Sequence, residues 1–245
     1  MRKKQRTIPA RISNNLLLIL ALVWLCIPRP AMSAAYGSYV YNPGSESYQD
    51  YSPLIVSVKI KELFLNGYLA NLKNFITADT RPKYLMILQD PNLIKSVSRA
   101  IVYTDYTIEK FKNVPFAGLH FDIEPHTLKN YNKKNGIMDL YALFGKLRSS
   151  FPRQNLSASL PYFYFTKYDA YYLTKPLDSF VCMIYSKRLK TVIEAADEII
   201  KKTSTPFYIA TVLSVHNNRK IIEHLAGKPM FLGIIKYDKQ NDSIF

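Results

Sequence analysis

The sequence has few of the residues on which several common protein classes depend. It holds only 2 cysteines, 1 tryptophan and 8 glycines among 245 residues. Two cysteines cannot form a disulfide scaffold or a four-thiolate zinc site. No Gly-x-Gly-x-x-Gly and no Gly-x4-Gly-Lys-Ser/Thr motif occurs, so the usual glycine-rich nucleotide loops are absent. The hydrophobic content of 48% is enough to bury a sizeable core and excludes a wholly disordered chain.

The first 34 residues have the pattern of a secretory signal peptide. A basic start precedes twelve apolar residues, Leu16 to Ile27, and small residues follow at positions 31–35. Twelve apolar residues are fewer than the roughly 20 that span a bilayer. We therefore expect residues 1–34 to be a cleaved signal peptide, residues 35–245 to form one domain, and the protein to be secreted or periplasmic. An uncleaved membrane anchor at this leader is the alternative.

The formal net charge of +15 becomes smaller when the leader is set aside. Residues 1–34 hold six basic residues and no acidic ones, so residues 35–245 carry 27 basic against 18 acidic residues, a charge of +9. No run of Lys or Arg longer than two occurs there. This charge favours acidic surfaces such as an envelope or polyanionic glycans, and we expect no nucleic-acid partner. Cys26 and Trp24 lie in the leader, which leaves Cys182 as the only thiol, in an apolar stretch typical of a small core residue.

Short apolar runs alternate with helical patterns along residues 35–245. Apolar spacings of three and four residues predict helices around 69–76, 93–101, 137–147, 192–200 and 221–225, and Ser52-Pro53 predicts the start of a short first helix. Alternating strands and helices favour a parallel sheet, and eight units indicate a small (β/α)8 TIM barrel with an abbreviated last unit; a doubly wound sheet is the alternative. The eight predicted strands are Ser38–Asn42, Ile60–Asn66, Lys83–Leu88, Phe116–Asp122, Asn155–Pro161, Ser179–Tyr185, Pro206–Val212 and Met230–Lys236.

The segment from Phe116 to His126 contains the residues best suited to chemistry. Strand alternation places Leu119, Phe121 and Ile123 on one face, and His120, Asp122 and Glu124 on the other. Polar groups on an inward face are costly to bury, and at the carboxyl end of a barrel strand they would open into a catalytic mouth. Two carboxylates about 6.6 Å apart along the strand raise the pKa of one of them, which favours a general acid. A buried polar cluster that only ties strands together is the other interpretation of this spacing.

The same segment resembles the fourth-strand signature of the family 18, chitinase-type glycoside hydrolases. The match lies at Phe116, Gly118, Leu119, Phe121, Asp122 and Glu124, whereas Ala117 and His120 replace acids of that signature. Gly-Leu-His-Phe-Asp-Ile-Glu-Pro-His resembles more closely a poorly characterised group of secreted bacterial barrels with a Gly-x-His-x-Asp-x-Glu-Pro-His run. Met183-Ile184-Tyr185 resembles the Met-x-Tyr-Asp of the family's sixth strand.

The resemblance implies a glycoside hydrolase that cleaves an envelope or extracellular polysaccharide. Glu124 would be the general acid, Asp122 would hold Glu124 and orient an acetamido group, and Tyr185 would bind that group. The missing tryptophan leaves sugar stacking to tyrosines. A monomer without metal or cofactor is expected, with membrane contact only through an uncleaved leader. The implied substrate-binding residues are His120, His126, Gln89, Tyr162, Tyr164 and Tyr237.

Two alternative functions follow from the same residues. The substituted acids and the absent tryptophan favour a non-catalytic glycan-binding barrel. The residue types of His120-x-Asp122-x-Glu124-x-His126 are also those of metal ligands, as a metal-dependent polysaccharide deacetylase would need. Same-face strand positions lie about 6.6 Å apart, however, so one ion cannot easily bind all of them.

The leader pattern makes a direct prediction. We expect cleavage between about Ala31 and Tyr36, because the small residues that signal peptidase requires lie there. Mass spectrometry of the exported protein should show a new amino terminus in this interval. Recovery of the intact chain from membranes would instead support the anchor.

Overall fold

A computed structural model of the chain describes residues 35–40, 60–66, 83–88, 90–113, 116–129 and 132–236. All of them belong to one compact unit, Ser33–Phe245. The predicted leader, the predicted helices at 52–53 and 69–76, Gln89 and Tyr237 lie outside the described residues. Within the described residues, every helix is too short or too polar to cross a membrane.

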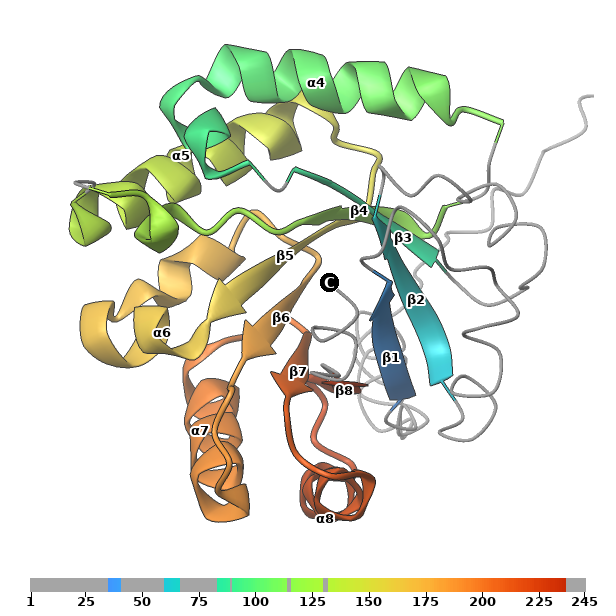
Figure 1. The fold of residues 1–245 in the computed structure, drawn as a ribbon, viewed down its shortest axis with the longest axis vertical. Coiled ribbons are helices and arrows are strands. Elements are labelled where there is room, and N and C mark those ends of the chain that lie inside the picture. Colours follow the sequence, from blue (N-terminus) through green and yellow to red (C-terminus); the bar gives the residue numbers. More distant parts are fainter. Residues whose placement is uncertain are drawn as a thin grey trace, which may run out of the picture. The chain divides into compact units, whose positions relative to one another are not determined.

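Eight parallel strands close into a barrel in the order of the chain, and β1 pairs with β8 to complete the ring. The (β/α)8 prediction is therefore confirmed, and the doubly wound sheet is excluded because an open sheet has two unpaired edges. Helices α4 to α8 lie around the outside of the strands in Figure 1. The strands are β1 (Ala35–Val40), β2 (Ile60–Asn66), β3 (Lys83–Leu88), β4 (Gly118–Phe121), β5 (Leu156–Pro161), β6 (Ser179–Met183), β7 (Phe207–Thr211) and β8 (Phe231–Lys236).

All eight predicted strands exist, and the differences are at their ends. β2 and β3 have the predicted bounds, whereas β4 is shorter than predicted at both ends. It ends at Phe121, so Asp122, the last residue of the predicted strand, stands beyond it, and so does Glu124. Pro125 is the first residue of a 3-10 turn, η2 (Pro125–Thr127). Proline has no backbone N–H, but the first residue of a helical turn makes no hydrogen bond within the turn through its N–H.

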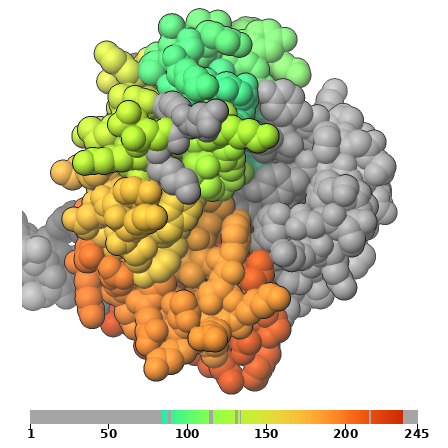
Figure 2. Space-filling view, turned by 60° about the vertical axis from the view of Figure 1, so that its left-hand side comes forward, coloured from blue at the N-terminus to red at the C-terminus, as the bar shows by residue number. Residues whose placement is uncertain are grey.

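Within the described residues, the outer layer contains the helices predicted around 93–101, 137–147, 192–200 and 221–225 and one that was not predicted. The stretch 93–101 is divided into a 3-10 turn and α4, because Ser96 adopts a non-helical conformation (φ −145°, ψ 83°) between them. The tyrosine-rich stretch after β5, where no helix was predicted, forms α6 and a 3-10 turn. In Figure 2 these segments follow one another down the surface in chain order, from green to orange-red. The elements are η1 (Pro91–Lys95), α4 (Val97–Lys110), α5 (Lys133–Ser150), α6 (Tyr162–Tyr168), η3 (Ala170–Thr174), α7 (Leu189–Lys202) and α8 (Val215–Leu225).

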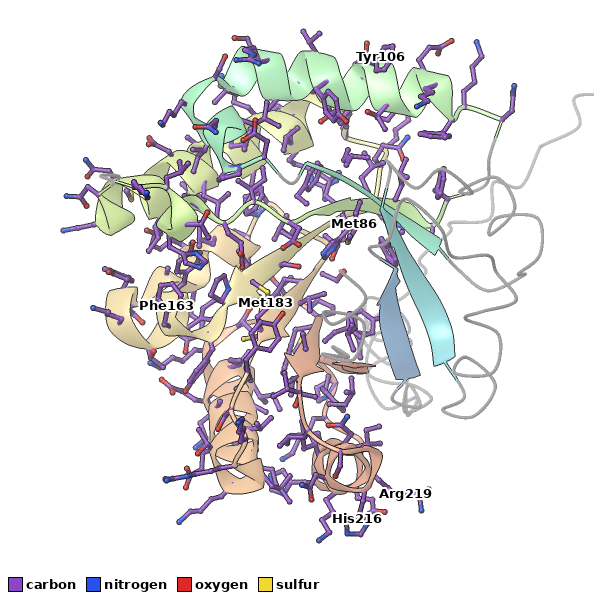
Figure 3. All side chains as sticks on the ribbon, viewed as in Figure 1. Met86, Tyr106, Phe163, Met183, His216 and Arg219 are labelled. Atoms are coloured by element: carbon purple, nitrogen blue, oxygen red, sulfur yellow. The ribbon has the colours of Figure 1, made fainter. Side chains whose placement is uncertain are left out.

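Buried apolar side chains form two separate clusters, one on each side of the strand ring. The larger cluster packs Leu119, Phe121 and Ile123 against apolar residues of the surrounding helices. The smaller one lies on the inner side of the ring and includes Met86 and Met183, which Figure 3 labels among the strands. The alternation predicted for the fourth strand is confirmed, because its apolar side chains all belong to the helix-facing cluster.

The start of β4 is fixed closely to its neighbours. The Leu119 N–H donates to the Asn155 carbonyl at 2.8 Å, and the Asn155 amide donates to the Ala117 carbonyl at 2.9 Å. A Cβ added at Gly118 would lie 2.7 Å from the Asn155 carbonyl oxygen and 2.8 Å from the Tyr84 ring. Glycine at this position therefore allows the close approach of strands that sets the register of the site.

Gly118→Ala should lower the free energy of unfolding by about 1–3 kcal/mol, since the new methyl group overlaps backbone atoms that cannot easily move. Gly145→Ala is the matched control. Nothing lies within 4 Å of a Cβ at Gly145, which is in the interior of α5, so this change should raise stability by up to about 1 kcal/mol. Urea denaturation measures both. Equal effects of the two substitutions would contradict the close contact at Gly118.

Candidate functional site

The polar residues of the barrel lie at the carboxyl end of β4 and on β5. His120 is fully buried on the inward face of β4. Its Nδ1 lies 3.1 Å from the Ser157 hydroxyl and its Nε2 lies 2.9 Å from the Ser159 hydroxyl. Both serines point inward from β5, because the residues that alternate with them belong to the helix-facing cluster. This arrangement satisfies both ring nitrogens inside the barrel.

Burial lowers the pKa of His120 to about 3, because an imidazolium loses its solvation when it is removed from bulk water. The ring is therefore neutral at physiological pH and donates to one serine while it accepts from the other. A ring with both nitrogens engaged in this way is not placed to bind a metal. Within the described residues, no group of three or more His, Cys, Asp or Glu side chains could hold a metal ion. The geometry therefore gives no support to the predicted metal-dependent alternative.

Asp122 and Glu124 follow β4 and are both partly buried. Asp122 stands between two residues of the helix-facing cluster, Phe121 and Ile123, so alternation directs it to the other side, as predicted. Burial raises the pKa of Glu124, and the charge of Asp122 adds to this effect, so that the pKa is about 7. The predicted coupling of the two carboxylates is therefore present. A carboxyl group with this pKa can both accept and donate a proton near neutral pH.

The turn that carries Glu124 is held by hydrogen bonds and by buried neighbours. The Thr127 N–H and hydroxyl both donate to the Glu124 carbonyl, at 3.0 and 2.7 Å. Ile123 and Pro125, on either side of Glu124, are buried. His126 lies on the same turn, and its Nδ1 is 3.0 Å from the hydroxyl of Tyr164 on α6. Glu124 and His126 therefore lie on one short, anchored turn at the carboxyl end of β4.

The three tyrosines predicted at the site lie in different places. Tyr185, after β6, is 46% exposed. Tyr164 is only 1% exposed, so its ring offers no face to a sugar. Tyr162 lies outside the barrel and donates its hydroxyl to Glu198 of α7 at 2.8 Å. Neither of these last two rings can be the stacking platform that the sequence suggested for a polysaccharide.

Two serines were missed by the sequence analysis. Ser157 and Ser159 alternate with apolar residues in a strand whose bounds were nearly correct, so the period of two could have identified them as inward-facing. Cys182 behaves as predicted: it is fully buried in the helix-facing cluster, and burial raises the pKa of its thiol well above the usual range.

Comparisons with known proteins bear on the fold. No protein-family model and no curated protein sequence matches the chain. A Toxoplasma gondii ME49 structure named for deoxyribose-phosphate aldolase has 8% sequence identity and a TM-score of 0.57, over 84% of this chain and 90% of that one. A structure of the same name from Coccidioides immitis has 7% identity and a TM-score of 0.54, over 95% and 98%. The Legionella pneumophila ChiA C-terminal domain has 10% identity and a TM-score of 0.57, over 86% and 95%. Identities this low show a shared barrel fold.

These comparisons correct the predicted family and activity. The structural neighbours are mainly named as aldolases, with the ChiA domain among them, so the assignment to family 18 glycoside hydrolases is wrong. The predictions of a polysaccharide hydrolase and of a polysaccharide partner are wrong with it, and so are the glycan-binding and deacetylase alternatives. The physical reason lies in the site itself. The motif matches at Asp122 and Glu124, but two of the rings expected to stack on a sugar are used otherwise: Tyr164 is buried and Tyr162 binds Glu198.

The raised pKa of Glu124 predicts how stability depends on pH. The pKa of this group is about 7 in the folded protein and 4.5 without perturbation, so the folded state binds the proton more tightly. The stability that this proton provides is present below pH 4.5 and is lost as the pH rises through 7. The free energy of unfolding of Glu124→Gln, relative to that of the wild type, should therefore rise by about 1–3 kcal/mol between pH 4.5 and about pH 8. Urea denaturation across this range measures it, with Glu223→Gln, an exposed carboxyl of α8, as control. If the difference in free energy of unfolding between Glu124→Gln and the wild type stayed constant across this pH range, the raised pKa of Glu124 would be contradicted.

Proposed function

We propose that the chain is an enzyme that transfers protons on a small polar molecule, with Glu124 as the acid–base group, and that its reaction is an aldol-type cleavage or formation of a carbon–carbon bond. The observation that carries the proposal is the carboxyl of Glu124, partly buried at the carboxyl end of β4, with its pKa raised to about 7. In (β/α)8 barrels the catalytic groups lie at this end of the strands.

The chemistry of an aldol cleavage suits such a group. A base removes the proton of the hydroxyl group β to a carbonyl, the oxygen forms a new carbonyl, and the carbon–carbon bond breaks. The electron pair of that bond passes to the carbon next to the original carbonyl, which is then protonated. A carboxylate with a pKa near neutrality can take the first proton without being permanently protonated itself. The names of the neighbouring barrels support this reaction class, and the substrate would be a small hydroxycarbonyl compound.

The carbonyl group of such a substrate can be activated by a Schiff-base lysine or by hydrogen bonds to its oxygen. No lysine is among the described side chains that form the interior cluster or contact His120: these are Tyr84, Met86, His120, Ser157, Ser159, Val181, Met183, Tyr208, Ala210, Leu232 and Ile235. Borohydride in the presence of the substrate distinguishes the two routes, because it reduces a Schiff base to a stable secondary amine and leaves a hydrogen-bonded carbonyl unattached to the protein.

The proposal is tested first by proton exchange, which does not require that the complete substrate be identified. The full chain is incubated in D2O with a panel of small hydroxycarbonyl compounds, with and without a phosphate group, and C–H exchange next to the carbonyl is followed by NMR. A compound that exchanges is then assayed for carbon–carbon cleavage. Glu124→Gln should lower kcat at least about a hundredfold, because the amide carries no transferable proton.

Glu223→Gln is the control and should retain the wild-type rate, since this exposed carboxyl belongs to α8 and not to the site. The acidic limb of the wild-type rate profile should have a midpoint near pH 7, where Glu124 ionises. Turnover by Glu124→Gln at the wild-type rate would exclude Glu124 as the acid–base group. Export of the enzyme is a separate proposal that follows from the leader pattern, and the amino terminus of the exported protein tests it.

A further inference from the structure

Tyr164 connects helix α6 to the turn that carries Glu124. Its side chain is 1% exposed, and its hydroxyl lies 3.0 Å from Nδ1 of His126. The rings of Phe163 and Tyr164 both stand edge-on to the imidazole, with centroid separations of 5.0 and 5.8 Å. η1 and α5 pack against η2 from the other elements. The imidazole of His126 therefore has a fixed orientation beside Glu124.

The surroundings of the phenol bear on the direction of the hydrogen bond between Tyr164 and His126. Burial raises the pKa of Tyr164, and the charge of Glu124 adds to the shift, so the hydroxyl keeps its proton. The backbone N–H of His126 acts in the opposite direction and lowers this pKa in part. A protonated hydroxyl 3.0 Å from Nδ1 can donate to that nitrogen when the imidazole is neutral.

We propose that the Tyr164 hydroxyl holds the neutral ring of His126 in the tautomer with its proton on Nε2, and that His126 in this form donates a hydrogen bond to the carbonyl oxygen of the substrate, beside Glu124 as the acid–base group. Tyr164 is then a positioning residue. The second half of this proposal rests on the proposed function, whereas the first half is a property of the protein alone.

The two groups then have different tasks in an aldol cleavage. Glu124 takes the proton of the hydroxyl group, and the Nε2–H of His126 donates a hydrogen bond to the carbonyl oxygen, which gains negative charge as the carbon–carbon bond breaks. Glu124 then delivers its proton to the carbon next to the carbonyl. The same proton enters and leaves Glu124, so both groups return to their starting state. The position of both groups on one turn places an acid–base group and a hydrogen-bond donor near one small molecule.

The tautomer is measured by long-range 15N–1H NMR correlation on the full-length labelled protein at alkaline pH, where an ordinary imidazole is neutral. Comparison with His126→Gln assigns the signals of His126 among the 4 histidines. We expect a single Nε2–H tautomer in the wild type and a mixture in Tyr164→Phe, which keeps the ring and removes only the hydroxyl. Tyr172→Phe is the matched control. Its hydroxyl contacts the Met138 sulfur at 3.3 Å, so the signals of His126 should not change.

Activity is measured on the same variants with a compound that the wild type turns over. His126→Gln should lower kcat about a hundredfold, and Tyr164→Phe about tenfold with little change in KM. A neutral His126 with its proton on Nδ1 in the wild type would overturn the tautomer. A fixed Nε2–H tautomer together with unchanged kcat in His126→Gln would overturn the catalytic role. If Glu124→Gln is fully active, the proposed function is wrong. The NMR spectrum still decides the tautomer of His126 independently.

Discussion

Polar side chains buried inside the barrel need hydrogen-bond partners, and this constraint organises the site. His120 enters the interior from β4, and two serines of β5 take both of its ring nitrogens. Burial then keeps the imidazole neutral, so this ring adds no uncompensated charge inside the barrel. The two carboxylates, Asp122 and Glu124, lie beyond the end of the strand instead, where they are only partly buried.

The position of Glu124 between protein and solvent determines its chemistry. A fully buried carboxyl would remain protonated, and a fully exposed one would ionise well below neutral pH. Partial burial, with Asp122 nearby, places the pKa at about 7. The turn around it is anchored by Pro125 and by the bond between His126 and Tyr164, so the carboxyl has a fixed position although it lies outside regular secondary structure.

The family assignment failed for a reason that applies to other barrels. Two carboxylates separated by one residue at the end of a strand are a local pattern, whereas a polysaccharide cleft needs aromatic faces from several βα loops. Two of the phenols expected to supply them have other roles: Tyr164 is buried beside His126, and Tyr162 binds Glu198 on the outer surface. The comparisons agree with a shared barrel and with a site whose chemistry must be derived from its own residues.

The sequence by itself determined the barrel and the inward face of its fourth strand, because strand alternation and the order of apolar runs are local properties. The eight strands, the burial of Cys182 and the coupling of Asp122 with Glu124 were all predictable in this way. Only the tertiary structure decided which groups from different strands meet. Ser157 and Ser159 are 37 and 39 residues from His120, and Tyr164 is 38 residues from His126, so their contacts depend on the register of β4 with β5 and on the unpredicted helix α6. Sequence spacing carries no information on such distances, because barrel closure sets them.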